Sequence, residues 1–200
     1  MRDILNTEKI RDIKNVKGEN EMSYYVFVDN SNVWIEGKFL SAVKKGMSGN
    51  TSDAHLKKIS DANWKIDFGK LLECVVDGNL ADVKEAVIVG SKPTQKDSLW
   101  NAMEKAGFKV ETQQRNASNR EKKIDTGIVQ KINRKLYKES EEGDIFVLVL
   151  GDSDYVPVIE DIKLEKRKVR VAFWDNAAGE IIDAADEYLN LNDSFEKITL

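Results

Sequence analysis

The sequence predicts one α/β domain in which a parallel sheet of about five strands carries helices on both faces. Short apolar segments rich in β-branched residues alternate along the chain with segments whose apolar residues recur at helical spacing. Two of the apolar segments are apolar at every position, which is typical of strands buried on both faces. A chain of 200 residues is long enough for one domain with a sizeable core and short for two.

The composition is that of a globular protein, with 41% hydrophobic and 33% charged residues. Cys74 is the single cysteine, which excludes an intrachain disulfide and gives no sign of an oxidising compartment. No apolar stretch is long enough to span a bilayer, and the polar residues 1–22 lack the apolar core of a secretory signal. We therefore expect a cytoplasmic protein with no membrane partner, made of an N-terminal extension (1–22) and one domain (23–200).

The predicted strands are short, and turn-forming or polar residues follow most of them. In chain order they are Tyr24–Val28, Val83–Val89, Phe108–Gln113, Ile145–Leu150 and Val169–Trp174. The first and fourth are the fully apolar ones, and the third alternates in character. Right-handed crossovers between such strands give a sheet order of 3-2-1-4-5.

The predicted helices occupy the segments between these strands. Asp29 to Asn32 are all turn or N-cap formers and predict a helix start, whereas Gly46–Ser60 is rich in loop-forming residues. Gly107 ends one helix, and apolar residues recur on one face of another. The first predicted helix follows Asn32 and continues to Lys45. The next ones are Asp67–Val76, Gln95–Ala106 and Asp125–Tyr137, then a helix that starts at the Gly151–Asp154 turn, and finally Gly179–Leu189. A further helix is predicted across Thr7–Val16 of the extension.

Four aspartates are expected at one edge of this sheet. Asp29 ends the first strand, and Asp152 and Asp154 follow the fourth strand, which is its neighbour in the order 3-2-1-4-5. Asp125 opens the helix after the third strand, and that helix start lies on the same edge. Ligands of such sheets bind at the carboxyl ends of the strands, where the winding direction reverses. Three segments distant in sequence therefore bring four carboxylates together.

Several carboxylates held this close repel one another, and a hard divalent cation removes the repulsion. Mg²⁺ or Mn²⁺ prefers oxygen ligands and keeps several waters, so a few carboxylates suffice. Zinc is not indicated, because His55 and Cys74 are the only histidine and cysteine and have no ligand spacing. We expect His55 to be a loop residue and Cys74 to lie in the core.

Each aspartate also has a structural explanation. Asp29, Asp125 and Asp152 could be N-caps, and Asp154 could be a first-turn acid favoured by the helix dipole. Taken singly, each of these explanations is favoured. Taken together at one edge, the metal site is favoured, because a cap after the fourth strand needs one acid and not two.

Three segments resemble the NYN family, a branch of the PIN-like nucleases. They are Val28-Asp29-Asn30-Ser31-Asn32, Lys123-Ile124-Asp125 and Leu150-Gly151-Asp152-Ser153-Asp154-Tyr155-Val156-Pro157, in the family's order and at plausible spacing. The tail around Lys168–Val171 and Ala184–Leu189 is also similar, so the resemblance spans roughly Tyr24 to Leu191. It implies a three-layer Rossmann-like, PIN-like domain.

The resemblance also implies cleavage of RNA phosphodiester bonds with Mg²⁺ or Mn²⁺. It makes Asp29, Asp125, Asp152 and Asp154 the metal ligands and catalytic residues, and it assigns Asn32 and Ser153 to substrate binding. Asn32 would hydrogen-bond a ligand, a metal-bound water or a phosphate, or is simply a helix-start residue. Lys131 departs from the pattern, because many relatives carry another aspartate six residues after the one matching Asp125. A mild departure is Tyr155 at a phenylalanine position. Asp175 has two explanations, as a replacement for the missing carboxylate or as a turn residue.

The charge distribution fits a nucleic-acid substrate better than the net charge of −4 does. Residues 109–138 contain nine basic and three acidic residues, a local surplus of six positive charges that could hold a polyanion. Taken without the motifs, a solvated helix face with a basic loop explains this surplus equally well. Within that stretch, a basic loop ahead of Asp125 could grip the RNA backbone through Arg115, Arg120, Lys122 and Lys123. Trp34 could stack a base if exposed, although core packing is the more common role of a helical tryptophan.

Two other functions compete with a ribonuclease. A degenerate relative that binds RNA or protein without cutting is suggested by Lys131 and opposed by the four aspartates. A phosphatase or nucleotide enzyme is less consistent with the sequence, because Asp-x-Asp after the first strand, the P-loop and the Rossmann glycine pattern are all absent. The sequence leaves open a homodimer or a protein partner.

Overall fold

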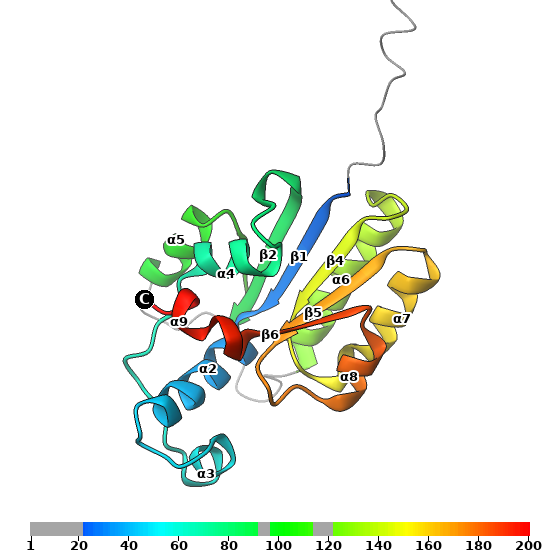
Figure 1. Cartoon of the computed structure of the whole chain (residues 1–200). Helices are drawn as coiled ribbons and strands as arrows, with labels where there is room; N and C mark the ends of the chain where they lie inside the picture. Colours follow the sequence, from blue (N-terminus) through cyan, green and yellow to red (C-terminus); the bar gives the residue numbers. More distant parts are fainter. Residues whose placement is uncertain (1–21, 92–96, 114–121) are drawn as a thin grey trace, which may run out of the picture.

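A six-stranded parallel sheet with the order β3-β2-β1-β4-β5-β6 forms the centre of the molecule (Figure 1). We analysed a computed structural model that describes residues 22–91, 97–113 and 122–200. The strands are β1 (Tyr24–Asp29), β2 (Val83–Ser91), β3 (Lys109–Gln113), β4 (Ile145–Val149), β5 (Lys168–Phe173) and β6 (Glu187–Asn190). The extension over residues 1–22, including the helix predicted across Thr7–Val16, lies outside the described residues except for its last member.

Helices cover both faces of the sheet and make the fold three-layered. One face packs against α2 (Asn30–Lys44), α4 (Phe68–Val75), α5 (Asp97–Lys105) and α9 (Phe195–Ile198). The other face packs against α6 (Lys122–Lys138), α7 (Val156–Leu164) and α8 (Gly179–Ala184). The helix α3 (Thr51–Lys57) follows α2, and three short 3₁₀ turns, η2 (Leu80–Asp82), η3 (Ser153–Tyr155) and η4 (Leu191–Ser194), connect other elements.

The strand β1 lies in the middle of the sheet, and this position explains why all of Tyr24–Val28 is apolar. Its residues alternate between the two faces: Tyr24, Val26 and Val28 join one core, and Tyr25 and Phe27 join the other. Every residue of β1 is buried. The continuous apolar pattern thus arises because both faces are covered by helices.

The predicted order of the first five strands is confirmed, and the number of strands is corrected to six. The final helix was predicted to continue to Leu189, but α8 ends at Ala184 and the chain forms β6 from Glu187. Parallel pairing with β5 draws this segment into the sheet. Tyr188 adds a tertiary anchor, since its hydroxyl donates to the Trp174 carbonyl at 2.6 Å. This pairing overrides the local helical pattern.

The loop predicted over Gly46–Ser60 contains the helix α3, which is a second correction. Asn50 caps it, because its side-chain oxygen accepts the backbone N–H of Asp53 at 2.8 Å. The helix ends at Lys57, and the following residue, Lys58, adopts the left-handed conformation with φ of 55°. Few apolar residues mark this helix, so its sequence resembles that of a loop.

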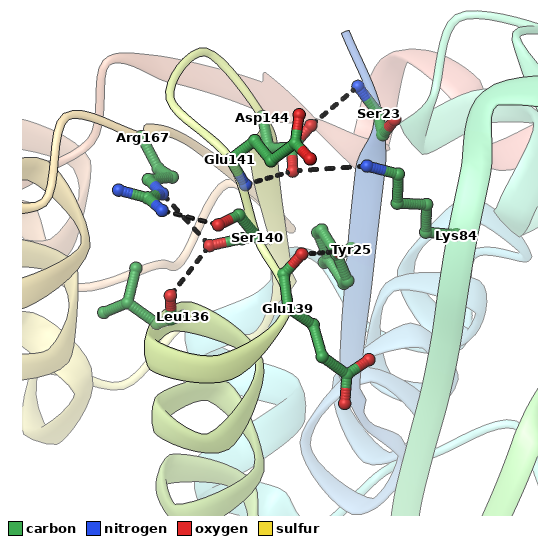
Figure 2. Close-up of polar contacts among 9 residues, drawn as sticks. All are labelled: Ser23, Tyr25, Lys84, Leu136, Glu139, Ser140, Glu141, Asp144 and Arg167. Atoms are coloured by element: carbon green, nitrogen blue, oxygen red, sulfur yellow. Dashed lines mark hydrogen bonds and ion pairs between the residues drawn. The ribbon is translucent and has the colours of Figure 1, made fainter. Parts of the chain in front are cut away.

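A polar network fixes the amino-terminal edge of the sheet (Figure 2). Asp144 is 3% exposed, and its carboxylate accepts the backbone N–H groups of Ser23 at 3.1 Å and Glu141 at 2.8 Å. The ammonium of Lys84 lies 3.6 Å from the same carboxylate. The hydroxyl of Tyr25 donates to the carbonyl of Glu139 at the end of α6. These contacts join the starts of β1 and β4, so the register of the two central strands is fixed at the edge opposite the predicted site.

Candidate functional site

Asp29 ends β1 and is 5% exposed. Its Oδ1 accepts the backbone N–H of Asn32 at 3.1 Å, so it caps α2 as expected. The cap also orients the carboxylate at the carboxyl end of the strand. A carboxylate buried in this position has lost most of its hydration, so the groups around it determine how stable its charge is.

The turn after β4 places Asp152 and Asp154 on the surface, with Ser153 partly exposed. Asp152 caps the 3₁₀ turn η3, accepting the backbone N–H of Asp154 at 3.3 Å. Tyr155 anchors the turn to the core, since its side chain is buried there with 1% of its surface exposed. Capping therefore explains Asp152, whereas the side chain of Asp154 does not cap this turn.

Gly151 gives this turn its shape. A Cβ atom on residue 151 would lie 2.1 Å from the ring of Phe173 in the neighbouring strand β5. Only glycine, which has no Cβ, therefore fits at position 151 with this backbone path. The carbonyl of Gly151 accepts the backbone N–H of Ala178 at 2.9 Å, which attaches the turn to the loop after β5.

Strand register brings the ends of β1 and β4 together. Val28 pairs with Val149 in the parallel ladder, so Asp29 and the 151–154 turn leave the sheet at adjacent positions. This is the point at which the order β3-β2-β1-β4-β5-β6 reverses direction. The structure therefore brings Asp29, Asp152 and Asp154 to one edge, as the strand pattern predicted.

Asp125 lies in the first turn of α6, which begins three residues earlier than predicted. Lys122 and Lys123 open the same helix, and for these three residues the contacts of the side chains stay a prediction. Arg115 and Arg120 lie outside the described residues. A four-aspartate cluster therefore stays a prediction as well.

The donor chemistry at this edge suits a hard cation. The three described aspartates offer oxygen alone, the ligand type that Mg²⁺ and Mn²⁺ prefer. The softer ligands are engaged elsewhere: His55 bonds to Glu36, and the thiol of Cys74 lies 3.2 Å from the hydroxyl of Ser194. Among the described residues, however, no group of three or more His, Cys, Asp or Glu side chains is arranged to hold a metal ion, so Asp29, Asp152 and Asp154 have suitable oxygen atoms but do not form a metal site by themselves.

Lys131 forms an ion pair with Glu111 of β3. The departure from the family pattern is thus part of a contact between α6 and the edge strand β3. Asp175, considered as a replacement carboxylate, is exposed after β5, and its backbone N–H donates to Asn192 at 3.2 Å.

Trp34 packs partly against the core, as the more common role of a helical tryptophan predicted. The ammonium of Lys38 lies 3.7 Å from the centre of its ring, which covers a ring face that a base would need.

A polar group that the sequence did not predict lies beside the site, where Glu36 joins two distant segments. Its Oε2 contacts the Nε2 of His55 at 2.8 Å and the Nδ2 of Asn176 at 2.6 Å. Glu36 follows Asn32 by four residues and so shares a helix face with it. That spacing was the one available signal, because Asn176 lies 140 residues away in sequence.

Comparison with known proteins shows the family. The NYN domain profile matches residues 23–192. The crystal structure of a protein of unknown function from Vibrio parahaemolyticus is similar, with a TM-score of 0.64 and 16% sequence identity over 92% of this chain and 99% of that one. At that identity the likeness shows the fold alone. No curated protein matches the chain. Among the described residues, no helix is long and apolar enough to cross a membrane.

Proposed function

The chain belongs to the NYN domain family, and from that premise we propose that it is a metal-dependent ribonuclease that hydrolyses RNA phosphodiester bonds. The observation that carries the proposal is the position of Asp29, a buried carboxylate at the switch point of the sheet, beside the Asp152–Asp154 turn. Two exposed acids next to a buried one form an oxygen-rich edge open to a phosphodiester substrate.

We assign the metal site to Asp29, Asp125, Asp152 and Asp154, with Mg²⁺ or Mn²⁺ as the ion. Such an ion supplies Lewis-acid stabilisation of the phosphate and lowers the pKa of bound water. The protein's part is positional. The Asn32 N–H orients Asp29, and the Asp154 N–H orients Asp152, so each carboxylate is fixed by a backbone bond before substrate arrives.

Substrate binding is assigned to residues around this edge. Asn32 and Ser153 lie in the first turns after β1 and β4, where helix N-termini favour a phosphate. The basic residues near the start of α6 would hold the RNA backbone through charge, which predicts salt-sensitive binding. They are Arg115, Arg120, Lys122 and Lys123.

A non-catalytic NYN-like module that binds RNA or a protein is the second candidate. The Lys131–Glu111 ion pair favours this candidate, because a lysine that pairs with Glu111 stands where many relatives have an aspartate. This candidate predicts RNA binding without metal-dependent cleavage.

Cleavage of labelled RNAs with Mn²⁺, Mg²⁺ or EDTA tests the proposal. The set includes single-stranded and structured RNAs, and wild type is compared with Asp152→Asn. Asp82→Asn is the matched control, since Asp82 is an exposed aspartate just before β2, at the other edge of the sheet. Cleavage that needs metal, disappears in Asp152→Asn and persists in Asp82→Asn supports the ribonuclease. Salt-dependent binding without cleavage in either metal supports the non-catalytic module.

A further inference from the structure

We propose that His55 is a stacking platform for a nucleobase of the RNA strand that flanks the scissile phosphate. The inference deepens the proposed ribonuclease function and rests on it, because it names how a single-stranded segment of the substrate is held. His55 belongs to α3, which lies in the segment Gly46–Ser60 that was predicted to be a loop.

The ring of His55 is held on two sides. Its Nε2 lies 2.8 Å from the Oε2 of Glu36, and the ring centre of Phe39 lies 4.0 Å from its own, with an angle of 33° between the planes. The side chain of His55 nonetheless stays 38% exposed. Because Phe39 contacts one face of the ring and Glu36 holds one nitrogen, the proposal places the base on the opposite face. An aromatic face that is already oriented loses little side-chain entropy when a base stacks on it.

The platform is connected to the proposed active site through Glu36. The same Oε2 accepts the Nδ2 of Asn176 at 2.6 Å, so His55 and Asn176 lie within hydrogen-bonding distance of one shared atom. Asn176 stands two residues before Ala178, whose N–H binds the carbonyl of Gly151 beside Asp152. Two residues of extended chain span at most about 7 Å. The platform is therefore a few nucleotides at most from the aspartates.

The arrangement of elements agrees with this connection. The helix α2 leaves the carboxyl end of β1, and α3 lies farther out on that same side of the sheet, beyond the strand ends (Figure 1). A strand of RNA bound at the carboxyl edge can continue across Glu36 and Asn176 toward α3.

Charge on the α2–α3 segment suits a polyanion. Residues 30–65 contain six lysines and three acidic residues, whereas the whole chain has a net charge of −4; of these lysines, Lys44, Lys45 and Lys57 are ion-paired. Lys58, directly after α3, is exposed and adopts a left-handed backbone conformation. A positive segment beside an aromatic face is the usual combination for single-stranded nucleic acids, because bases stack in a sequence-tolerant way while cations hold phosphates.

Trp34 is the competing aromatic on the same helix, and its geometry is less suitable. Lys38 lies over its ring at 3.7 Å, and the ring packs partly against the core. His55 is in contrast held from behind by another ring.

Three substitutions at position 55 separate stacking from a structural tether. His55→Phe keeps the aromatic face and loses the bond to Glu36. His55→Gln keeps a hydrogen-bonding side chain and loses the face. His55→Ala loses both. The control is Leu56→Ala, since Leu56 is the next residue of α3 and is 81% exposed. Binding of a labelled single-stranded RNA to each full-length variant is measured in EDTA by fluorescence anisotropy, so that cleavage cannot interfere.

For stacking, we expect Kd to rise about tenfold in the Ala and Gln variants and to stay within about twofold in the Phe variant and in Leu56→Ala. Fluorescence of 2-aminopurine, scanned along the RNA, should be quenched at one or two adjacent positions by wild type and not by His55→Gln. If Gln restores binding and Phe does not, His55 is a tether and the inference is wrong. Equal binding by all variants also overturns it.

These outcomes stay separate from those of the ribonuclease assay. RNA binding with localised quenching but no cleavage would keep the platform and reject the nuclease. Metal-dependent cleavage with unchanged binding across the position-55 variants would keep the nuclease and reject the platform.

Discussion

The ring of Phe173 occupies the space in which a side chain at residue 151 would begin, 2.1 Å from the position of a Cβ on Gly151. Phe173 is 2% exposed and ends β5, so it cannot move aside without disturbing the core. The path of the chain from β4 to Asp152 thus depends on a contact made by the neighbouring strand.

Gly151→Ala should lower the free energy of unfolding by about 1–3 kcal/mol, because the added methyl overpacks the core. It should also displace the 152–154 turn and lower RNA cleavage more than Asp82→Asn does. Denaturant unfolding and cleavage rates on the same samples check both effects. Gly49→Ala is the control, since nothing lies within 4 Å of a Cβ there. Equal behaviour of the two alanine variants would contradict the steric explanation.

Asp29→Asn and Asp29→Ala should separate capping from chemistry. Asparagine caps helices about as well as aspartate, so Asp29→Asn should retain the α2 cap while it lowers metal-dependent cleavage more than about tenfold. Asp29→Ala should lower cleavage as much and lose about 1 kcal/mol of additional stability. Thermal unfolding measured beside cleavage distinguishes these losses. Full activity of a stable Asp29→Asn variant would exclude Asp29 as a metal ligand.

Lys131→Asp should not increase cleavage, although it restores the acid found in many relatives. The new carboxylate would face Glu111, and the substitution would remove the ion pair of Lys131 with Glu111. At a partly exposed site such a pair stabilises the fold by at most about 1 kcal/mol. The double variant Lys131→Asp with Glu111→Lys should recover that stability. Urea unfolding of the four proteins in the cycle measures the coupling. A clear gain of activity in Lys131→Asp would show that the lysine limits metal binding.

Asp61 should make stability depend on pH in acid. Hydrogen bonds from Lys45 at 2.6 Å and Ser41 at 2.7 Å lower the pKa of its carboxyl to about 2, against burial, which acts to raise it. Because the pKa of Asp61 is lower in the folded state, its ionised carboxylate stabilises the fold at pH values above the ordinary pKa of 3.8. This stabilisation is lost as the pH falls toward 2. Asp61→Asn should lose about 1–2 kcal/mol at neutral pH and show a flatter pH dependence between pH 4 and 2. Unfolding free energies across that window test this, with the exposed Asp82→Asn as control.

The sequence predicts the central sheet well because the local pattern and the tertiary environment agree there. β1 and β4 are buried on both faces, and a continuous apolar run is the direct result. The meeting of Asp29 with the Asp152 turn follows from strand alternation and right-handed crossovers alone.

The missed elements depend on long-range contacts. β6 forms through pairing with β5 and the Tyr188 hydroxyl bonds, none of which leaves a local signal. The position of His55 depends on Phe39, Glu36 and, through Glu36, on Asn176. A short polar helix with such partners has the composition of a loop.

The anchoring of Ser23 by Asp144 has a practical consequence for surface-based measurements. Ser23 sits at the amino-terminal edge of the sheet, and Asp29, six residues later, at the opposite end of the same central strand. A tether attached ahead of Ser23 would pull on the network of Figure 2 and not on the aspartates. Attachment at this end of the described chain should therefore leave the opposite edge of the sheet, which carries Asp29 and the proposed metal site, facing the solution.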